Sequence, residues 1–371
     1  MNIKIKGMKR MINVTKPFLP EISEYIEVLN EIWERGWLTN QGPCVQTLEK
    51  EIGEYLDISN INFVTNGTIA LQLALKALDI TEGEVITTPF SYVATTSSIM
   101  LEGCTPVFVD INPETLQIDT ELIEEKITAN TKAIMAVHVF GLPCEVDKIE
   151  EIAKKYNLAV IYDAAHAFGV IYKGKSLLSY GDSSTCSFHA TKLFHTVEGG
   201  CVVSRSDQVH EKVDLIKRFG HNGDDHICLG TNAKNSELHA AMGLVNLRHV
   251  DEIIRKRQEI SEQYDSILNS YVIFPKKPEN LQYNYAYYPI ILESEKLLLA
   301  VMEEMKNNNI FPRRYFFPSL NDIDYVGSKS ECKISSDIAS RILCLPLYPE
   351  LDKEDVNKIG EIVKNTICSA L

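Results

Sequence analysis

Between residues 61 and 204 the sequence alternates short β-branched runs with longer helical stretches, and this alternation constrains the fold more than any other feature. Strands that alternate with helices predict an α/β fold in which helices cover both faces of a mostly parallel sheet. Ligands in such sheets bind beyond the carboxyl ends of the strands. Strands are expected at residues 62–65, 84–88, 106–110, 133–139, 159–163, 185–188 and 201–204, with helices at 68–78, 92–102 and 145–156.

The last third of the chain indicates a second, smaller unit. A length of 371 residues exceeds that of a single typical core. A helical region at 236–268 begins with small apolar residues and becomes heavily charged, and the pattern breaks near 269–278. Further expected elements are a strand at 287–292, a helix at 296–307 and a final helix after Asp352. We therefore expect a large domain at 1–252, including an amino-terminal arm, and a smaller carboxy-terminal α/β domain at 253–371.

The charge and cysteine content argue against several classes of protein. A formal net charge of -14 disfavours binding to the phosphate backbone of nucleic acids. Nine cysteines without a C-x-x-C pair argue against a disulfide framework or a zinc ribbon, and no metal site is expected. No run of about 18 apolar residues is present, so no membrane-spanning helix is expected. These features predict a cytoplasmic protein.

Lys192 is a candidate nucleophile. It follows an expected strand in the run SFHATK at residues 187–192, and the run EGG comes shortly afterwards at 198–200. A lysine in an apolar, partly buried setting has a lowered pKa and can attack an aldehyde to form a Schiff base. The alternative is a solvated surface lysine, which is the more common situation for any single lysine.

Asp163 ends an expected hydrophobic strand in the run VIYDAAH at residues 160–166. A carboxylate at this position can pair with a protonated pyridine nitrogen and so keep the ring an electron sink. The alternative is a helix N-cap or a turn aspartate. The small neighbours Ala164 and Ala165 favour the functional interpretation, because they leave room for a flat ring.

Asn66, Gly67 and Thr68 lie at an expected junction between a strand and a helix. Gly67 permits close approach to the backbone, and the free N–H groups of a first helical turn can bind a phosphate. A plain N-cap by Thr68 is an alternative that is compatible with this role. Tyr92 follows the next expected strand and can stack on a planar ring, although an aromatic residue at such a place is more often part of the core.

A phosphate cradle, an aromatic residue, a carboxylate and a lysine thus occur in this order, each at the carboxyl end of an expected strand. In this combination the chain resembles the DegT/DnrJ/StrS sugar aminotransferases, which have the aspartate aminotransferase fold. The resemblance implies fold type I of the enzymes that depend on pyridoxal 5'-phosphate (PLP), with a mostly parallel seven-stranded sheet in the large domain. It extends from about residue 14 to the carboxyl terminus and rests on residues 37–43, 66–68, 163–166, 187–192, 198–200, 230–234 and 313–316.

The resemblance also implies roles for individual residues. Lys192 would attach to the cofactor aldehyde and move protons during catalysis, and Asp163 would pair with the pyridine nitrogen. Tyr92 would stack on the ring, and His166 would lie near the ring hydroxyl group. The phosphate group would be held by Gly67, Thr68 and Ser187.

Asn232 matches the asparagine with which this family reaches the phosphate in the neighbouring subunit, so a homodimer with shared sites is implied. Two residues depart from the usual pattern of the family. Lys234 stands where many members have arginine, and Val197 stands where many have glycine. Both departures leave the core chemistry unaffected but weaken any inference about substrate contacts.

Within the family, the segments at 189–196 and 313–315 resemble the branch that aminates C4 of dTDP-4-keto-6-deoxyglucose, as in viosamine biosynthesis. Such an enzyme would serve deoxyaminosugar biosynthesis for surface polysaccharides such as a lipopolysaccharide O-antigen. L-Glutamate would donate its amino group to PLP, giving pyridoxamine 5'-phosphate (PMP), and the keto-sugar would then accept the group. The nucleotide sugar would be positioned by Thr39, Gln41, Arg313 and Tyr315.

Several alternatives remain open at this point. Arg313 and Arg314 could bind the diphosphate through charge-assisted hydrogen bonds or form a solvated charge cluster. The same chemistry could act on a 3-keto sugar or a cyclitol. The same fold could also carry a PLP lyase or decarboxylase, or a non-catalytic regulator that binds the cofactor.

Overall fold

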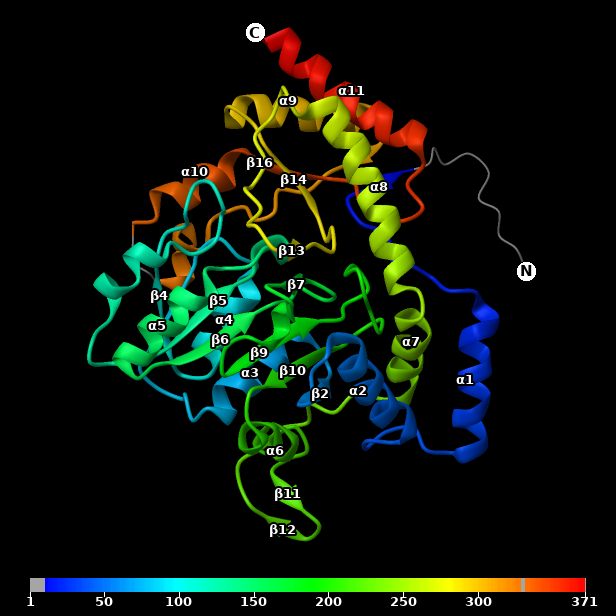
Figure 1. The fold of residues 1–371 in the computed structure, drawn as a ribbon, viewed down its shortest axis with the longest axis vertical. Coiled ribbons are helices and arrows are strands. Elements are labelled where there is room, and N and C mark those ends of the chain that lie inside the picture. Colours follow the sequence, from blue (N-terminus) through cyan, green and yellow to red (C-terminus); the bar gives the residue numbers. More distant parts are fainter. Residues whose placement is uncertain (1–10, 328–330, 371) are drawn as a thin grey trace.

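The computed structural model describes residues 11–327 and 331–370, and within them a seven-stranded sheet forms the centre of the large domain (Figure 1). The strand order is β2-β10-β9-β6-β5-β3-β4, and every neighbouring pair is parallel except the two that include β10. The predicted α/β fold with a mostly parallel seven-stranded sheet is confirmed, and each strand overlaps a predicted one. The strands are β2 (Ile61–Val64), β3 (Glu84–Thr87), β4 (Thr105–Phe108), β5 (Thr131–Val137), β6 (Ala159–Asp163), β9 (Ser183–Ser187) and β10 (Gly200–Ser204).

Successive residues of these strands point to opposite faces of the sheet and contribute to two separate hydrophobic cores. In β6, Val160 and Tyr162 pack into one core and Ile161 packs into the other. In β5, Ile134 packs into the same core as Val160 and Tyr162, and Met135 packs into the same core as Ile161. Both faces of these two strands are therefore apolar and require helices on both sides of the sheet.

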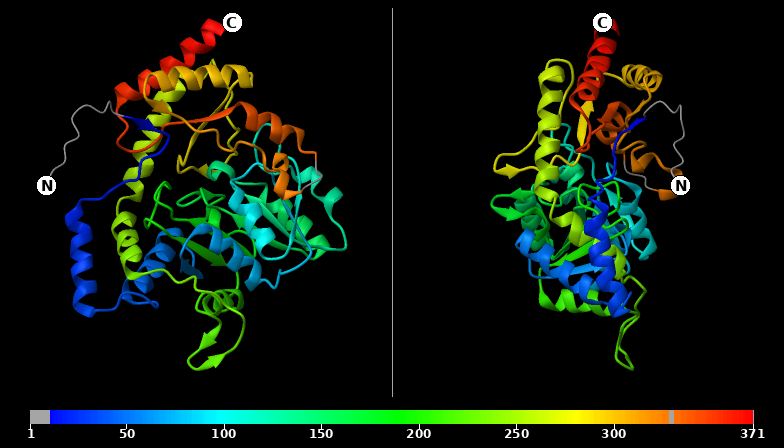
Figure 2. Two further views of the ribbon diagram at one scale, coloured as in Figure 1. Left: turned by 180° about the vertical axis from the view of Figure 1, so that it is seen from behind. Right: turned by 90° about the vertical axis from the view of Figure 1, so that its right-hand side faces the viewer.

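Helices α2, α5 and α7 cover one face of the sheet, and α3, α4 and α6 cover the other. Helix α1 lies along α7 at the edge of the molecule (Figure 2). Helices α3, α4 and α5 correspond to predicted helices, whereas α1, α2 and α6 were not predicted. Their bounds are α1 (Ile22–Arg35), α2 (Pro43–Leu56), α3 (Gly67–Ala77), α4 (Val93–Leu101), α5 (Val146–Tyr156), α6 (Asp207–Ile216) and α7 (Glu237–Leu247).

The carboxy-terminal part of the chain has a hydrophobic core of its own. Helices α8, α9 and α11 pack there with the antiparallel pair of β14 and β16, and β1 joins this part by pairing with β15. Helix α10 and strand β16 were not predicted. The elements are β1 (Ile12–Asn13), α8 (Val250–Leu268), β14 (Tyr288–Ile291), α9 (Glu295–Asn307), β15 (Ile310–Phe311), α10 (Lys333–Arg341), β16 (Ile342–Leu345) and α11 (Lys353–Ala370).

The helical region predicted at 236–268 is divided into α7 and α8 by Arg248 and His249. Helix α7 is buried almost throughout, whereas α8 is amphipathic and passes from one core to the other. Ile253 packs into the core of the large sheet, and Tyr264 packs into the carboxy-terminal core. Because α8 contributes to both hydrophobic cores, the predicted domain boundary between residues 252 and 253 stays a prediction.

Smaller elements complete the described part of the chain. The hairpin of β11 and β12 projects from the body of the molecule (Figures 1 and 2). No helix among residues 11–327 and 331–370 is long and apolar enough to cross a membrane, and those residues contain no group of three or more His, Cys, Asp or Glu side chains arranged to hold a metal. The remaining strands are β7 (Ile171–Tyr172), β8 (Lys175–Ser176), β11 (His221–Asn222), β12 (Asp225–His226) and β13 (Leu281–Gln282), with 3-10 turns at Thr120–Leu122, Glu124–Lys126, Val139–Gly141, Leu177–Ser179, Leu320–Asp322 and Asp324–Val326.

Candidate active site

A cavity of about 690 Å³ lies at the carboxyl ends of the central strands. Val137, Asp163 and Ser187 are the last residues of β5, β6 and β9, and all three line it. This is the edge of the sheet at which parallel α/β folds bind their ligands. The predicted site residues that line the cavity are Gly67, Thr68, Tyr92, Asp163, His166, Ser187, Lys192, Arg313 and Tyr315.

Lys192 lies in the connection between β9 and β10, and its side chain is half-buried. Its Nζ donates a hydrogen bond of 3.5 Å to Oη of Tyr287. Burial lowers the pKa of the lysine amine, and the negative charge of Asp163 opposes that shift. A lysine with a lowered pKa is a better nucleophile near neutral pH, so the geometry fits the predicted reaction with an aldehyde better than a solvated surface role.

Asp163 is buried at the end of β6, and both of its carboxylate oxygens accept hydrogen bonds. Oδ2 accepts from Oγ1 of Thr95 at 2.6 Å, and Oδ1 accepts from the N–H of Ala165 at 3.2 Å. Burial raises the pKa of this carboxyl, whereas the two donors and the charge of Lys192 oppose the shift. Asp163 does not cap a helix, because the residues that follow it form turns.

The first turn of α3 forms a cradle beside β9. The N-cap is Asn66, whose side chain accepts from the N–H of Ile69 at 2.9 Å, so the alternative of a cap by Thr68 is wrong. The amides of Gly67 and Thr68 belong to the first helical turn, which lacks partners within the helix. A Cβ atom at Gly67 would lie 3.0 Å from Cβ of Ser187, so only glycine leaves this contact unstrained. The cradle suits a phosphate group.

Tyr92 and His166 occupy different parts of the cavity. Tyr92 precedes α4 and is 62% exposed, so it does not belong to the core. His166 is buried, lies parallel to the ring of Phe316 at 5.9 Å, and meets the ring of Tyr287 edge-on at 4.7 Å. Burial holds the pKa of His166 well below its usual value. The imidazole is therefore neutral and can act as a hydrogen-bond partner without carrying charge.

Arg313 and Arg314 are adjacent in sequence but point to different surroundings. Arg313 lines the cavity, with its guanidinium 5.7 Å from the ring centre of Tyr315. Arg314 donates to Oε1 of Glu295 at 2.7 Å and to the carbonyl oxygen of Ser340 at 2.8 Å. Only Arg313 faces the ligand space, so a joint contact of both arginines with one diphosphate is not supported.

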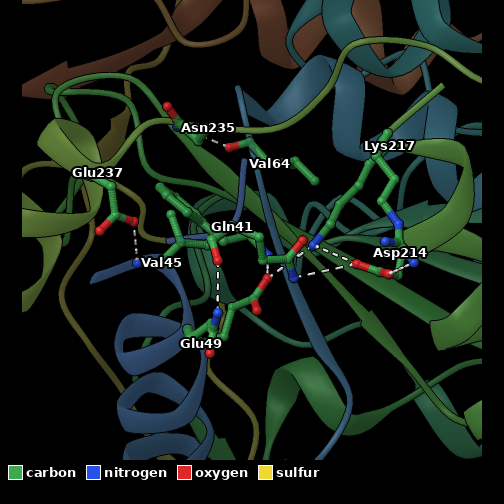
Figure 3. Close-up of polar contacts among 11 residues, drawn as sticks. Gln41, Val45, Glu49, Val64, Asp214, Lys217, Asn235 and Glu237 are labelled. Atoms are coloured by element: carbon green, nitrogen blue, oxygen red, sulfur yellow. Dashed lines mark hydrogen bonds and ion pairs between the residues drawn. The ribbon is translucent and has the colours of Figure 1, made fainter. Parts of the chain in front are cut away.

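Thr39 and Gln41 do not line the cavity, although they were predicted to bind substrate. They belong to an exposed loop that ends where α2 begins. The side chain of Gln41 donates to Oδ1 of Asp214 at 3.4 Å, and Asp214 in turn pairs with the buried Lys217 at 3.2 Å (Figure 3). Lys217 also pairs with Glu49 at 3.1 Å (Figure 3). This partly buried ion-pair cluster holds the loop at Gln41.

Glu237 holds the same loop at the point where α2 begins. Its fully buried carboxylate accepts from the N–H group of Cys44 at 2.8 Å, at the start of α2. It also accepts from the N–H group of Val45 at 3.0 Å (Figure 3). A carboxylate at a helix amino terminus satisfies free amides and interacts favourably with the helix dipole. A Cβ atom at Gly42 would lie 2.6 Å from this carboxylate, which explains why residue 42 is a glycine.

Asn232 also lies outside the cavity. It is exposed, accepts a hydrogen bond of 3.0 Å from Nζ of Lys234, and pairs through its backbone with Arg218 beside the projecting hairpin. Its predicted reach into a neighbouring subunit stays a prediction.

Sequence reasoning missed two residues that contact the predicted ones. Thr95 follows Tyr92 by one helical turn, and this spacing could have indicated that it lies on the same side of α4. Tyr287 is 95 positions from Lys192, and no local pattern connects the two.

Comparisons with known proteins show the family to which the chain belongs. The model of the DegT/DnrJ/EryC1/StrS aminotransferase family matches residues 21–364. A dTDP-4-amino-4,6-dideoxy-D-glucose transaminase from Shigella dysenteriae is 44% identical over 367 residues, which cover 96% of this chain and 99% of the relative.

Two solved structures share the fold. DesI, solved in the presence of its TDP-sugar product, superposes with a TM-score of 0.93 at 28% identity, covering 98% of this chain and 94% of DesI. A chain from Streptococcus pneumoniae that is named as a sugar aminotransferase, solved in its PMP-form, superposes with a TM-score of 0.88 at 25% identity, covering 97% and 98%. The chain therefore belongs to the DegT/DnrJ/EryC1/StrS aminotransferase family.

Proposed function

We propose that the protein is a PLP-dependent aminotransferase that converts dTDP-4-dehydro-6-deoxy-D-glucose to the 4-amino sugar, with L-glutamate as the donor. The observation that carries this proposal is the convergence of Lys192, Asp163 and the amino terminus of α3 on one cavity. The identity of 44% to a transaminase named for a 4-amino-4,6-dideoxyglucose supports the position of amination. The PMP-form of a relative with the same fold supports the cofactor.

The residues of the cavity fit PLP. The amides of Gly67 and Thr68, with Ser187, would hold the phosphate, and the missing Cβ at Gly67 keeps that cradle open. Asp163 would hold the ring nitrogen, because its buried carboxylate keeps acceptor capacity beyond the two hydrogen bonds that it already makes. The neutral His166 would lie near the ring hydroxyl group, and Tyr92 would stack on the ring.

When bound, PLP supplies an aldehyde that accepts an amino group and a ring that delocalises the negative charge left at the substrate carbon. Lys192 is the base: its uncharged amine takes the proton from Cα of glutamate in the first half-reaction and places a proton on C4 of the sugar in the second. Asp163 stabilises a positive charge on the ring nitrogen throughout. Over the full cycle the amino group of glutamate replaces the keto oxygen of the sugar, and glutamate leaves as 2-oxoglutarate.

The proposal also includes the residues that bind the substrate and the assembly of the protein. Arg313 and Tyr315 would position the nucleotide sugar, and Thr39 and Gln41 would act from the loop before α2. Asn232 would complete the site of a second subunit in a homodimer; its exposure beside a projecting hairpin supports this arrangement. All nine cysteines are free thiols, which supports a reducing, cytoplasmic setting.

The proposal is tested by the absorbance of the purified protein loaded with PLP. We expect a visible band from the lysine-bound cofactor, its loss on addition of L-glutamate, and its return on addition of dTDP-4-dehydro-6-deoxy-D-glucose. Mass spectrometry should then detect the 4-amino sugar. The variant Lys192→Ala is the control, because it lacks the amine that attaches the cofactor.

Each failure has its own meaning. A band that glutamate bleaches but this sugar does not restore would keep the aminotransferase and reject the substrate. A protein that binds no PLP under any condition would overturn the proposal as a whole.

A further inference from the structure

Thr95 and Asp163 form a short, buried hydrogen bond beneath the cavity. Thr95 lies in α4 and is fully buried, and its Oγ1 is 2.6 Å from Oδ2 of Asp163 at the end of β6. The bond joins two elements that are 68 positions apart in the sequence. It therefore depends on the packing of α4 against the sheet and not on local chain geometry.

Chemistry gives the bond a direction. An ionised carboxylate only accepts hydrogen bonds, so Thr95 must donate its hydroxyl proton to Asp163. Oγ1 of Thr95 also lies 2.7 Å from Oγ of Ser91, which is buried. Because the proton of Thr95 is engaged, Ser91 donates to Thr95. The chain of donors thus runs from Ser91 through Thr95 to Asp163 and ends on the carboxylate.

The bond also restricts the orientation of the carboxylate. Oδ1 accepts from the N–H of Ala165 and Oδ2 accepts from Thr95, so rotation of the carboxylate would break both bonds. The lone pairs that remain can accept one further donor from the side of the cavity, which Asp163 lines.

We propose that Thr95 is a positioning residue, whose hydroxyl group holds the Asp163 carboxylate in the orientation and charge state that bind a protonated ring nitrogen. This inference rests on the proposed function. Thr95 touches neither cofactor nor substrate in this assignment and acts only through Asp163.

The electrostatic surroundings explain why such a donor is needed. Burial raises the pKa of Asp163, which favours the neutral acid. Among the described residues, the titratable groups that interact with its charge are Lys192, whose positive charge favours ionisation, and the buried thiol of Cys186. Hydrogen bonds to the ionised form oppose the effect of burial. Loss of the Thr95 donor should therefore raise the pKa of Asp163 further.

The chain offers a matched control on the same helix. Thr96 is also fully buried, but its hydroxyl group has no hydrogen-bond partner among the described residues. Thr95→Val and Thr96→Val make the same change in shape and polarity one residue apart. Only the first removes a hydrogen bond to Asp163, and Thr95→Ser keeps that bond.

The test measures the titration of Asp163 in the protein without cofactor, by NMR of carboxyl-labelled aspartate with assignment by Asp163→Asn. Thr95→Val should raise the proton affinity of Asp163 by roughly tenfold or more, because hydrogen bonds to charged groups are strong. Thr96→Val and Thr95→Ser should titrate like the unmodified protein. If the titration midpoint of Asp163 is the same in Thr95→Val as in the unmodified protein, the inference is overturned.

If Thr95→Val does not fold, Ser91→Ala takes its place. It removes the donor to Thr95 while leaving residue 95 intact, and a smaller shift in the same direction is expected. No shift would likewise overturn the inference.

With PLP and substrates, Thr95→Val should lower kcat by about tenfold and leave KM for the nucleotide sugar within about twofold, with recovery in Thr95→Ser. The two proposals fail separately. If Thr95→Val raises the titration midpoint of Asp163 but the unmodified protein has no transaminase activity, the role of Thr95 is supported and the proposed function is rejected. If the unmodified protein is an active transaminase but Thr95→Val leaves the titration midpoint of Asp163 unchanged, only the role of Thr95 is rejected.

Discussion

The amine of Lys192 lies 3.5 Å from the hydroxyl group of Tyr287, which directly precedes β14 in the carboxy-terminal part of the chain. Lys192 belongs to the connection that follows β9 of the large sheet. The contact therefore joins the two parts of the molecule at the Lys192 amine, and residues of both parts line the cavity. Tyr287 also contacts the rings of His166 and Tyr315, so it links three residues that line the cavity.

Tyr287→Phe should lower kcat several-fold, because Lys192 loses the partner that orients its amine. This is the size of effect expected from the free energy of one hydrogen bond. KM for the nucleotide sugar should change less than kcat. Tyr285→Phe is the matched control, since Tyr285 does not line the cavity. Steady-state kinetics of the three proteins give the comparison, and equal kcat values in all of them would contradict the assignment.

The reactivity of Lys192 should depend on pH in a defined direction. Burial lowers its pKa below the usual lysine value of 10.5, so the uncharged amine becomes populated at lower pH than for a solvated lysine. Trapping of a small aldehyde on Lys192 by borohydride should therefore reach its half-maximal rate below pH 10.5. The carboxylate of Asp163 raises this pKa, so Asp163→Asn should move the midpoint to still lower pH. A midpoint that rises in this variant would disprove the electrostatic coupling.

Arg313→Ala should raise KM for the nucleotide sugar by about tenfold, which is typical for the loss of a charge-assisted hydrogen bond. Arg314→Ala should leave KM nearly unchanged, because the Arg314 side chain is bound to Glu295 and Ser340. The two variants remove the same charge, so a net-charge effect would move both values together. Measurement of KM at constant ionic strength distinguishes these outcomes.

Lys217→Met should lower the free energy of unfolding by about 3 kcal/mol, because two partly buried carboxylates, Glu49 and Asp214, lose their shared cation. Lys212→Met is the control, since its ion pair with Asp79 is largely exposed and should contribute less than about 1 kcal/mol. Urea denaturation followed by circular dichroism provides both values. Equal losses would show that burial of the pair is not what matters.

The central sheet and the residues that gather at its carboxyl edge could be predicted from local sequence patterns. All seven strands of the sheet overlap predicted ones. Most of them contain an apolar run that can be recognised locally, because both faces of a central strand are buried, whereas β9 consists of Ser, Thr and Cys. The positions of Lys192, Asp163 and Gly67 followed from the same pattern. Each stands at the carboxyl end of a strand, and parallel strands bring those ends to one edge.

Which side chains meet depends on how the elements pack, and local patterns do not report it. Arg313 and Arg314 are chemically alike, but the extended backbone at Arg313, which pairs with Cys344, sends neighbouring side chains in opposite directions. The helical region at 236–268 is divided because its first half must cover the sheet and its second half must reach the carboxy-terminal core.

The contacts of Thr95 with Asp163 and of Tyr287 with Lys192 span 68 and 95 positions and arise from the packing of separate elements. Local sequence patterns report which residues are buried and in which element they lie. They do not report which distant side chain completes a hydrogen bond, because that depends on how the elements pack against one another.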